Sequence, residues 1–334
     1  MTNTLVQPSV DSRPTPQSTR IGIALPTYRR PEFLARCIRS IIVSGSKYSV
    51  PIYVVDDSGD DTNLHVINTL KAEYPHLHHV RNEGNIGIDR NIVKSVNCCL
   101  TNYVWIMGED DLLKPHAIER ALDVLENHDY AFVCANYSYI SNDQARIIRD
   151  KRLDVSDGLI DGNLFIARYL WAIGFIGACI INKERWLQAI PEKYMDTFFA
   201  HVGVIVESIA GQSLYIISEP IVLNRAENAS SATWSSNAFE VMYGWTELLD
   251  RLADVCDTKL ILTLRCTSEE IFWHESIPFL LAQRAEQTYN RDKFDRFLRH
   301  RNYCPVYKVF ALLIAYLPTR PLAALKRAFQ RLRS

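Results

Sequence analysis

Three consecutive carboxylates, Glu109, Asp110 and Asp111, follow an apolar run that ends at Met107. Packing does not favour such a cluster, because neighbouring like charges raise one another's pKa unless cations or hydrogen-bond donors neutralise them. Mg²⁺ and Mn²⁺ take oxygen ligands, often one or two carboxylates together with substrate phosphates. The acidic run therefore predicts a divalent metal beside a diphosphate. The alternative is a solvated acidic loop in which Asp111 caps the next helix.

A second acidic pair, Asp56 and Asp57, follows the apolar run 51–55 and precedes Ser58 and Gly59. In dinucleotide-binding folds an acidic residue after the second strand accepts a hydrogen bond from the ribose. Asp56 and Asp57 are therefore candidate nucleotide-binding residues, and a plain Asx turn is the alternative.

A polar loop at 85–91 contains Asn85, Arg90 and Asn91. Gly84 and Gly87 permit close backbone approach there, and an arginine can grip a phosphate with two parallel hydrogen bonds. The alternative is helix capping by Asn or Asp beside a surface arginine. Each of the three loops alone is weak evidence for a ligand-binding site, whereas three such loops at one edge of the sheet are strong evidence.

The elements that position these loops alternate between apolar runs and helical periodicity. We expect strands at 21–25, 51–55, 77–80, 103–107 and 130–140, and helices at 31–43, 62–74, 89–100 and 115–128. This alternation predicts an α/β fold with a mostly parallel sheet and right-handed crossovers. Ligands bind outside the carboxyl ends of such strands, where the polar loops fall.

The rest of the chain is less regular. We expect a helix at 161–173, a strand at 175–181, a helix at 198–210, one or two strands at 214–218 and 221–223, and helices from Phe239 onward. The expected divisions are a disordered leader at 1–19, a domain at 20–235 with halves 20–140 and 141–235, and a helical C-terminal region at 236–334. Ordered structure is expected to begin at Ile21.

Composition excludes some classes of function. The chain has 334 residues, 48% of them hydrophobic and 22% charged, which is typical of a globular protein. Its net charge of −1 gives no support for a nucleic-acid partner. Eight cysteines without a CxxC pair favour reduced thiols, and the N-terminus shows no export signal, so we expect a cytoplasmic protein.

The charged residues of the C-terminal tail are all basic, since no Asp or Glu follows Asp295. An apolar segment, Val309–Leu317, is shorter than the roughly 20 residues that span a bilayer. The tail is therefore expected to lie on an anionic inner-membrane surface, and the alternative is a packed helix with a solvated basic face. Its basic residues are Arg296, Arg299, Arg301, Lys308, Arg320, Lys326, Arg327, Arg331 and Arg333.

Four motifs carry a resemblance to a known family. They are Pro26-Thr27-Tyr28-Arg29-Arg30, Val54-Val55-Asp56-Asp57-Ser58, Asn85-x-Gly87-x-x-Arg90-Asn91 and the acidic run before Leu112-Leu113-x-Pro115. In order and spacing, over roughly residues 20–225, they resemble the family 2 glycosyltransferases, which have the Rossmann-like GT-A fold. The Gly-acid-Asp-Asp form is similar to the abequosyltransferase-like branch, which acts in bacterial O-antigen and capsule assembly.

The resemblance implies roles for particular residues. Pro26, Thr27, Tyr28 and Arg30 would line the base pocket, Asp56 would bind the base or ribose, Arg90 would lie by the nucleotide, and Arg225 would face the diphosphate. Gly108 stands where the family has the first acidic residue of its Asp-x-Asp element. Asp110 is therefore expected to be the principal ligand of Mn²⁺ or Mg²⁺, with Glu109 and Asp111 supporting it.

The family usually supplies its catalytic base from a Glu-Asp pair about a dozen residues before a glycine. Gly211 matches that glycine, but the window before it has no such pair. His201 is the nearest candidate base and Asp196 competes with it, although a helical histidine is more often structural.

The resemblance implies an inverting transfer from a nucleotide sugar to a lipid-linked or saccharide acceptor. A sugar-phosphate nucleotidyltransferase and a non-catalytic nucleotide-sugar-binding protein are the alternatives.

Overall fold

The structure is a computed structural model that describes residues 17–18, 20–141, 143, 145–225, 238–256, 276–301 and 303–331. Most of the predicted leader therefore lies outside the described residues. Within it, β1 (Gln17–Ser18) pairs in parallel with β3 (Tyr48–Ser49), so the expectation that ordered structure begins at Ile21 is wrong by one short strand.

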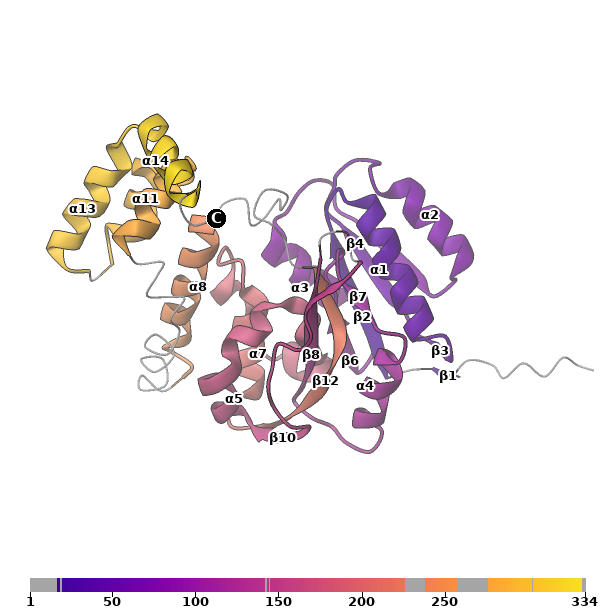
Figure 1. The fold of residues 1–334 in the computed structure, drawn as a ribbon. Helices are drawn as coiled ribbons and strands as arrows, with labels where there is room; N and C mark the ends of the chain where they lie inside the picture. Colours follow the sequence, from indigo (N-terminus) through magenta and orange to yellow (C-terminus); the bar gives the residue numbers. More distant parts are fainter. Residues whose placement is uncertain are drawn as a thin grey trace, which may run out of the picture.

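The first half follows the predicted alternation of strands and helices (Figure 1). The strands β2, β4, β6 and β8 are mainly apolar and buried on both faces, as expected for a sheet covered by helices, whereas the edge strand β5 has one buried residue, Leu77. Proline occupies the first turn of the first helix, where its missing N–H costs no hydrogen bond. In chain order the elements are β2 (Ile21–Thr27), α1 (Pro31–Ser44), β4 (Ile52–Asp56), α2 (Leu64–Glu73), β5 (Leu77–Arg81), α3 (Ile88–Cys98), β6 (Tyr103–Ile106), β7 (Leu112–Leu113), α4 (Ala117–Leu125) and β8 (Phe132–Ile140).

The ten-stranded sheet has the order β10-β12-β8-β11-β6-β2-β4-β5, with β7 paired to β12 and β9 to β8. The block β6-β2-β4-β5 is parallel throughout, as predicted. Beyond it, β11 (Cys179–Asn182) runs antiparallel to both β6 and β8, so β8 and its parallel neighbour β12 (Ser213–Arg225) point the same way as the block. The three remaining strands, β7, β9 (Ile147–Arg149) and β10 (Gly158–Asp161), run in the opposite direction.

Two predictions for the second half need correction. The expected strand at 175–181 begins only at Cys179, because Ile176–Ala178 is a 3₁₀ turn. The indole Nε1 of Trp105 donates to the carbonyl of Gly177 at 2.8 Å, which takes that carbonyl out of the sheet ladder. The segments 214–218 and 221–223 form one strand, β12, whose register shifts on both sides of Pro220 because proline has no N–H to donate.

The predicted helices of this half are shorter than expected. α5 (Gly162–Tyr169) continues as a 3₁₀ turn at Leu170–Gly174. After the short α6 (Lys183–Trp186) and a 3₁₀ turn at Pro191–Tyr194, α7 (Ala200–Ile209) passes through the core with most of its residues buried.

The C-terminal region is helical where it is described. Its elements are α8 (Ala238–Leu252), α11 (Ile277–Ala285), α12 (Arg291–Lys293), a π-helical turn (Phe294–Leu298), α13 (Pro305–Tyr316) and α14 (Thr319–Arg331). Phe239 and Tyr243 of α8 belong to a second apolar core with α11 and α13, whereas Leu248 and Leu252 belong to the core under the sheet. α8 is therefore shared by two cores.

None of the described helices is by itself long and apolar enough to cross a membrane. The pair α13 and α14 meets that criterion together by length and composition, but the two helices are bent by 99° at the break between them.

Candidate functional site

The carboxyl ends of β2, β4 and β6 bring three of the predicted loops together. Thr27 pairs with Asp56 across β2 and β4, and the Asp57 amide donates to the Thr27 carbonyl at 2.9 Å. The Met107 amide donates to the carbonyl of Ala24 at 2.9 Å, which holds the acidic run beside the end of β2. The sequence prediction of one polar sheet edge agrees with this arrangement.

Glu109 joins the loops after β2 and β6. Its Oε2 accepts from the Thr27 hydroxyl and from the Tyr28 amide, the latter at 2.9 Å, and its Oε1 lies 3.6 Å from Nε of Arg30. Burial raises the pKa of Glu109 to about 7, although these donors and Arg30 act against that shift. Through these contacts Glu109 fixes the loop after β6 to the loop after β2.

Asp110 lies between two arginines from distant parts of the chain. Its Oδ2 accepts from Nη1 of Arg30 at 2.9 Å and from Nη2 of Arg225, at the end of β12, at 2.5 Å. The Arg225 side chain is only 4% exposed and its guanidinium lies over the Phe33 ring at 4.4 Å. Two nearly buried guanidinium groups that converge on one point form a site suited to a phosphate or carboxylate.

Asp111 is buried and accepts from the backbone amide of Arg225 at 3.1 Å. A Cβ at Gly108 would lie 2.5 Å from Oδ2 of Asp111, so the glycine at this position follows from the way Asp111 packs. The alternative that Asp111 caps the next helix is not seen, because the residue before α4 is His116.

The three carboxylates do not form the predicted three-ligand metal site. Among the described residues, no group of three or more His, Cys, Asp or Glu side chains is arranged to hold a metal ion. Glu109 and Asp111 accept hydrogen bonds from the protein, and their assignment as supporting ligands stays a prediction. Asp110, which faces the two arginines, is the carboxylate that remains compatible with a cation shared with substrate phosphates.

Asp56 and Asp57 are buried and shape the loops around them. Oδ1 of Asp56 accepts from the amide and hydroxyl of Ser58 and from Asn63, at 3.1, 2.6 and 3.0 Å. This is the Asx turn that was the alternative interpretation. Asp57 accepts from the amides of Ile86 and Gly87 at 2.8 and 3.2 Å, so it fixes the loop at 85–91.

The loop at 85–91 has a structural and an exposed part. Asn91 is buried and donates to the Val55 carbonyl at 3.2 Å, whereas Asn85 is exposed and accepts from the Gly87 amide at 2.8 Å. Gly87 has φ of 89°, and a Cβ at Gly59 would lie 3.0 Å from Cα of Gly84. Close backbone approach is thus realised at Gly84.

Arg90 reaches across to the second half of the chain. Its Nη1 donates to Oδ1 of Asp196 at 2.7 Å, with both side chains about half exposed. Asp196 and Phe198 have positive φ of 64° and 68°, conformations that non-glycine residues rarely adopt and that often occur at functional sites. The interaction with Arg90 lowers the pKa of Asp196.

Asp89 is a site residue that the sequence did not reveal. Its buried carboxylate accepts from the amides of Phe198 and Ala200 at 2.9 and 3.0 Å, which holds the strained turn before α7 against α3. An acidic residue in the first turn of a predicted helix resembles an ordinary cap, so the sequence offered no signal for this long-range role.

His201 does not have the environment of a catalytic base. It is 1% exposed, and its Nε2 lies 3.0 Å from the carbonyl of Ile173. Burial lowers the pKa of His201 to about 4, so the imidazole is a weak base that solvent does not reach. The structural interpretation of this histidine holds, and the half-exposed Asp196 remains the candidate.

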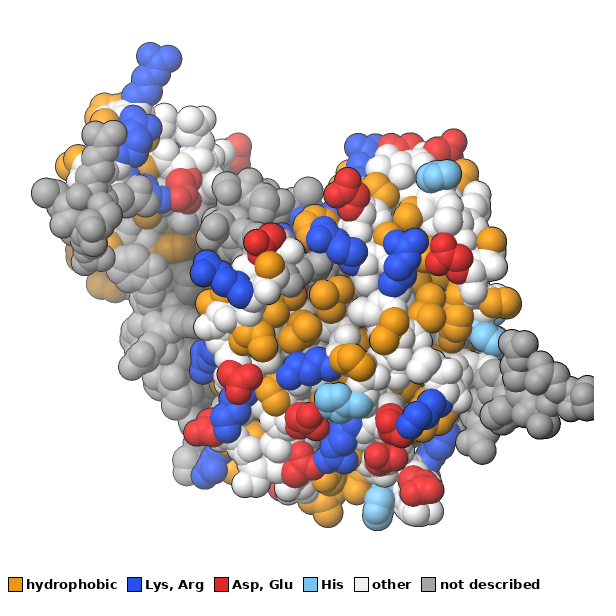
Figure 2. All heavy atoms as spheres, turned by 45° about the vertical axis from the view of Figure 1, so that its right-hand side comes forward, with side chains coloured by type: hydrophobic (Ala, Val, Ile, Leu, Met, Phe, Trp, Pro, Cys, Tyr) orange, Lys and Arg blue, Asp and Glu red, His pale blue; other side chains and the backbone are white. Residues whose placement is uncertain are grey.

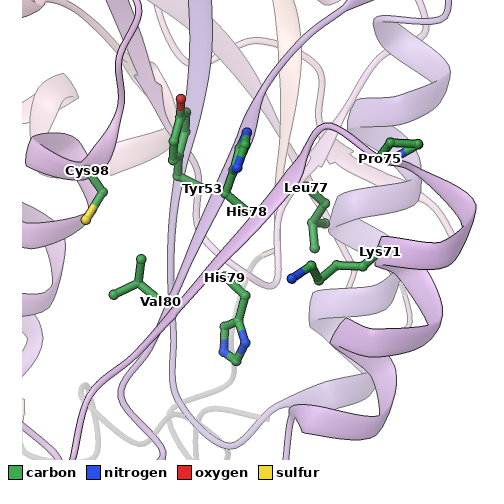
Figure 3. A pocket seen from close by; sticks show the side chains of 8 residues that line it. All are labelled: Tyr53, Lys71, Pro75, Leu77, His78, His79, Val80 and Cys98. Atoms are coloured by element: carbon green, nitrogen blue, oxygen red, sulfur yellow. The ribbon is translucent and has the colours of Figure 1, made fainter.

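A separate pocket of about 580 Å³ wraps the edge strand β5 (Figure 3). Tyr53 and His78, whose rings stack at 4.7 Å, point one way, and His79 points the other. None of the predicted site residues lines this pocket, although Nε2 of its lining residue His79 lies 3.9 Å from Oδ2 of Asp56 at the end of β4.

Known proteins similar to this chain share its fold. The profile described as glycosyl transferase family 2 matches residues 23–190, which is half of the chain. An abequosyltransferase of Salmonella typhimurium is 28% identical over 228 residues, covering 63% of this chain and 68% of that protein. A poly(ribitol-phosphate) β-N-acetylglucosaminyltransferase of Staphylococcus aureus is 23% identical, over 50% of this chain and 51% of that protein.

Among solved structures, TarS 1–349 of Staphylococcus aureus superposes with a TM-score of 0.57 at 11% identity, covering 92% of this chain and 91% of that chain. Its complex with UDP-GlcNAc gives a TM-score of 0.55 at 12% identity, with the same coverage. This likeness confirms the predicted GT-A fold.

Proposed function

The chain belongs to glycosyl transferase family 2, and from this premise we propose that it moves a sugar from a nucleotide-sugar donor to an acceptor hydroxyl. The observation that carries the proposal is the convergence of Arg30 and Arg225 on Asp110 at the carboxyl-end edge of the sheet. A nucleotide sugar carries a diphosphate, which two nearly buried guanidinium groups are suited to bind. The fold neighbour TarS has been crystallised with UDP and with UDP-GlcNAc, which supports this donor class.

In the proposed reaction the acceptor oxygen attacks the anomeric carbon and the bond from that carbon to the diphosphate oxygen breaks. The acceptor proton moves to a protein base, and the nucleoside diphosphate leaves with the bonding electrons. Arg30 and Arg225 would stabilise the negative charge that develops on the leaving group. A single in-line displacement inverts the anomeric configuration.

Asp196 is the base that the geometry supports. Its carboxylate is 59% exposed and lies at the start of the turn that leads into α7. The Asp89 carboxylate accepts hydrogen bonds from two amides of that turn, and these bonds fix the position of the Asp196 carboxylate. Because Arg90 lowers the pKa of Asp196, the carboxylate must leave this ion pair to become a stronger base.

We retain Mn²⁺ or Mg²⁺ as a proposed cofactor with Asp110 as its protein ligand. When bound, such a cation would neutralise part of the diphosphate charge. The Asp110 carboxylate accepts hydrogen bonds from Arg30 and Arg225. A bound cation would therefore contact the same carboxylate as the two arginines, and all three cations would lie near the phosphates.

The proposed acceptor is a lipid-linked or other saccharide in cell-surface polysaccharide synthesis on the cytoplasmic side of a membrane. Support comes from the abequosyltransferase name of a relative that covers 63% of this chain. Family membership as a glycosyltransferase sets aside the nucleotidyltransferase alternative and the non-catalytic alternative.

The test is a panel of nucleotide sugars incubated with the purified chain and Mn²⁺ or Mg²⁺, with and without EDTA, in which release of free nucleoside diphosphate is measured. We expect one donor to be turned over, with loss of roughly 100-fold or more in Arg225→Ala and in Asp110→Asn. Asp154→Asn is the matched control, because Asp154 is 93% exposed and pairs only locally with Lys151. Absence of binding by calorimetry for every donor would refute the proposal.

A further inference from the structure

The outer face of α13 carries a row of exposed apolar side chains, which we call the α13 stripe. It consists of Val306, Val309, Phe310, Leu313 and Tyr316, which recur at three- and four-residue spacing and are 52–62% exposed. The opposite face of the same helix, with Ala311, Ile314 and Ala315, is already buried in the C-terminal core. The stripe is therefore a second apolar face that the fold does not use.

The location of the stripe makes it accessible to a large partner. α13 lies at the outer edge of the molecule, far from the sheet (Figure 1). Single exposed apolar residues are ordinary, but a contiguous row of them marks an interaction surface. The active-site loops lie elsewhere, so the stripe does not belong to the site described above.

The charges on the helix that follows the stripe indicate the kind of partner. The chain bends by 99° after α13 and enters α14, where Arg320 and Arg327 are exposed and form no ion pair with a described residue. Lys326 is paired with Glu286 of α11. In the upper-left part of Figure 2, where these helices lie, Lys and Arg side chains are close to hydrophobic ones, and a few acidic side chains are also visible. No acidic residue follows Asp295 to offset them.

We propose that the α13 stripe, with Arg320 and Arg327, docks this protein on an anionic lipid surface, with α13 lying in the plane of the interface. A helix of 12 residues is too short to cross a bilayer, but it can bury one apolar face at the headgroup boundary. Nearby arginines are attracted to anionic headgroups. A two-fold contact between two copies would instead bring the exposed arginines of both copies close together.

The test is flotation of the full chain with vesicles of phosphatidylcholine alone and with vesicles that also contain phosphatidylglycerol. We expect binding to the anionic vesicles, roughly tenfold or more weaker for Phe310→Ser/Leu313→Ser. The substitutions Arg320→Gln and Arg327→Gln should each weaken binding about fivefold, mainly on anionic vesicles. The matched control is Leu100→Ser/Leu187→Ser, because these leucines are 88% and 61% exposed on the sheet-bearing part of the chain.

Three outcomes would overturn the proposal. They are no binding of the wild type to anionic vesicles, equal binding by the wild type and the stripe variant, and equal binding to neutral and anionic vesicles. Light scattering that shows a dimer for the wild type and a monomer for the stripe variant would assign the stripe to a second copy instead. Donor turnover by the stripe variant with a soluble acceptor should stay at the wild-type level, so this test is independent of the proposed reaction.

Discussion

On the proposed donor side, at the ends of β2, β4 and β6, Asp57 is buried, the Glu109 side chain is 12% exposed, and both accept several hydrogen bonds from neighbouring loops. On the proposed acceptor side, before α7, Asp196 is about half exposed in a turn with positive φ and forms an ion pair with Arg90. Buried polar groups with all partners in place fix a geometry, whereas an exposed turn adapts at little cost. We therefore expect the loops of the proposed donor side to be preformed and the turn of the proposed acceptor side to change shape on binding.

The largest expected effect is on catalysis at the acceptor side. Asp196→Asn should lower kcat by roughly 10²- to 10⁴-fold, because an amide cannot take the acceptor proton. Its free energy of unfolding should be unchanged, since an exposed ion pair contributes little to stability. Glu192→Gln, four residues earlier, is the control. Wild-type kcat in Asp196→Asn would show that the base lies elsewhere.

The second prediction concerns stability at the donor side. Asp57→Ala should lower the free energy of unfolding by about 2–4 kcal/mol, because the amides of Ile86 and Gly87 lose a buried acceptor. Urea denaturation measures this loss. Asp154→Ala, at an exposed position, should stay within about 0.5 kcal/mol. A loss of similar size in both variants would mean that Asp57 does not organise the loop.

The third prediction is a pH dependence that Glu109 adds. Its pKa is about 7 in the folded protein and near the ordinary 4.5 when unfolded. Between pH 4.5 and about pH 7, Glu109 keeps its proton in the folded chain and has lost it in the unfolded chain, so the free energy of unfolding decreases as the pH rises. The difference in unfolding free energy between the wild type and Glu109→Gln should change by up to about 3 kcal/mol from pH 4 to pH 8. A flat difference would contradict the raised pKa.

The smallest expected effect is at His201. His201→Leu should cost about 1 kcal/mol of stability through loss of the contact with the Ile173 carbonyl, and kcat should keep the pH profile of the wild type. Thermal unfolding and the pH dependence of turnover measure the two quantities. A pH profile that changes in this variant would return His201 to the list of candidate bases.

The sequence predicted what depends on local pattern. Buried runs such as 103–107 and the helical periodicity between them placed the strands, and the strand order of an α/β fold placed the polar loops on one edge. It could not predict the partners of each carboxylate. Arg225 is 115 positions away from Asp110, and only the folded chain shows that Asp110, and not Glu109 or Asp111, faces two arginines.

The errors have the same physical origin. His201 was a candidate because a neutral imidazole is an adequate base, but burial against Ile173 is a property of the packed core that local sequence does not encode. The strand expected from Phe175 was shortened by one hydrogen bond from Trp105, 72 positions earlier than Gly177. Long-range contacts decided both cases.

Gly108 has a consequence for how this chain can change by mutation. Any side chain there would meet the carboxylate of Asp111, where a Cβ would be 2.5 Å from Oδ2. A side chain at this position would therefore require the Asp111 side chain to be replaced or turned. The side chains at positions 108 and 111 therefore depend on one another, and a substitution at Gly108 should be tolerated better when Asp111 is replaced first.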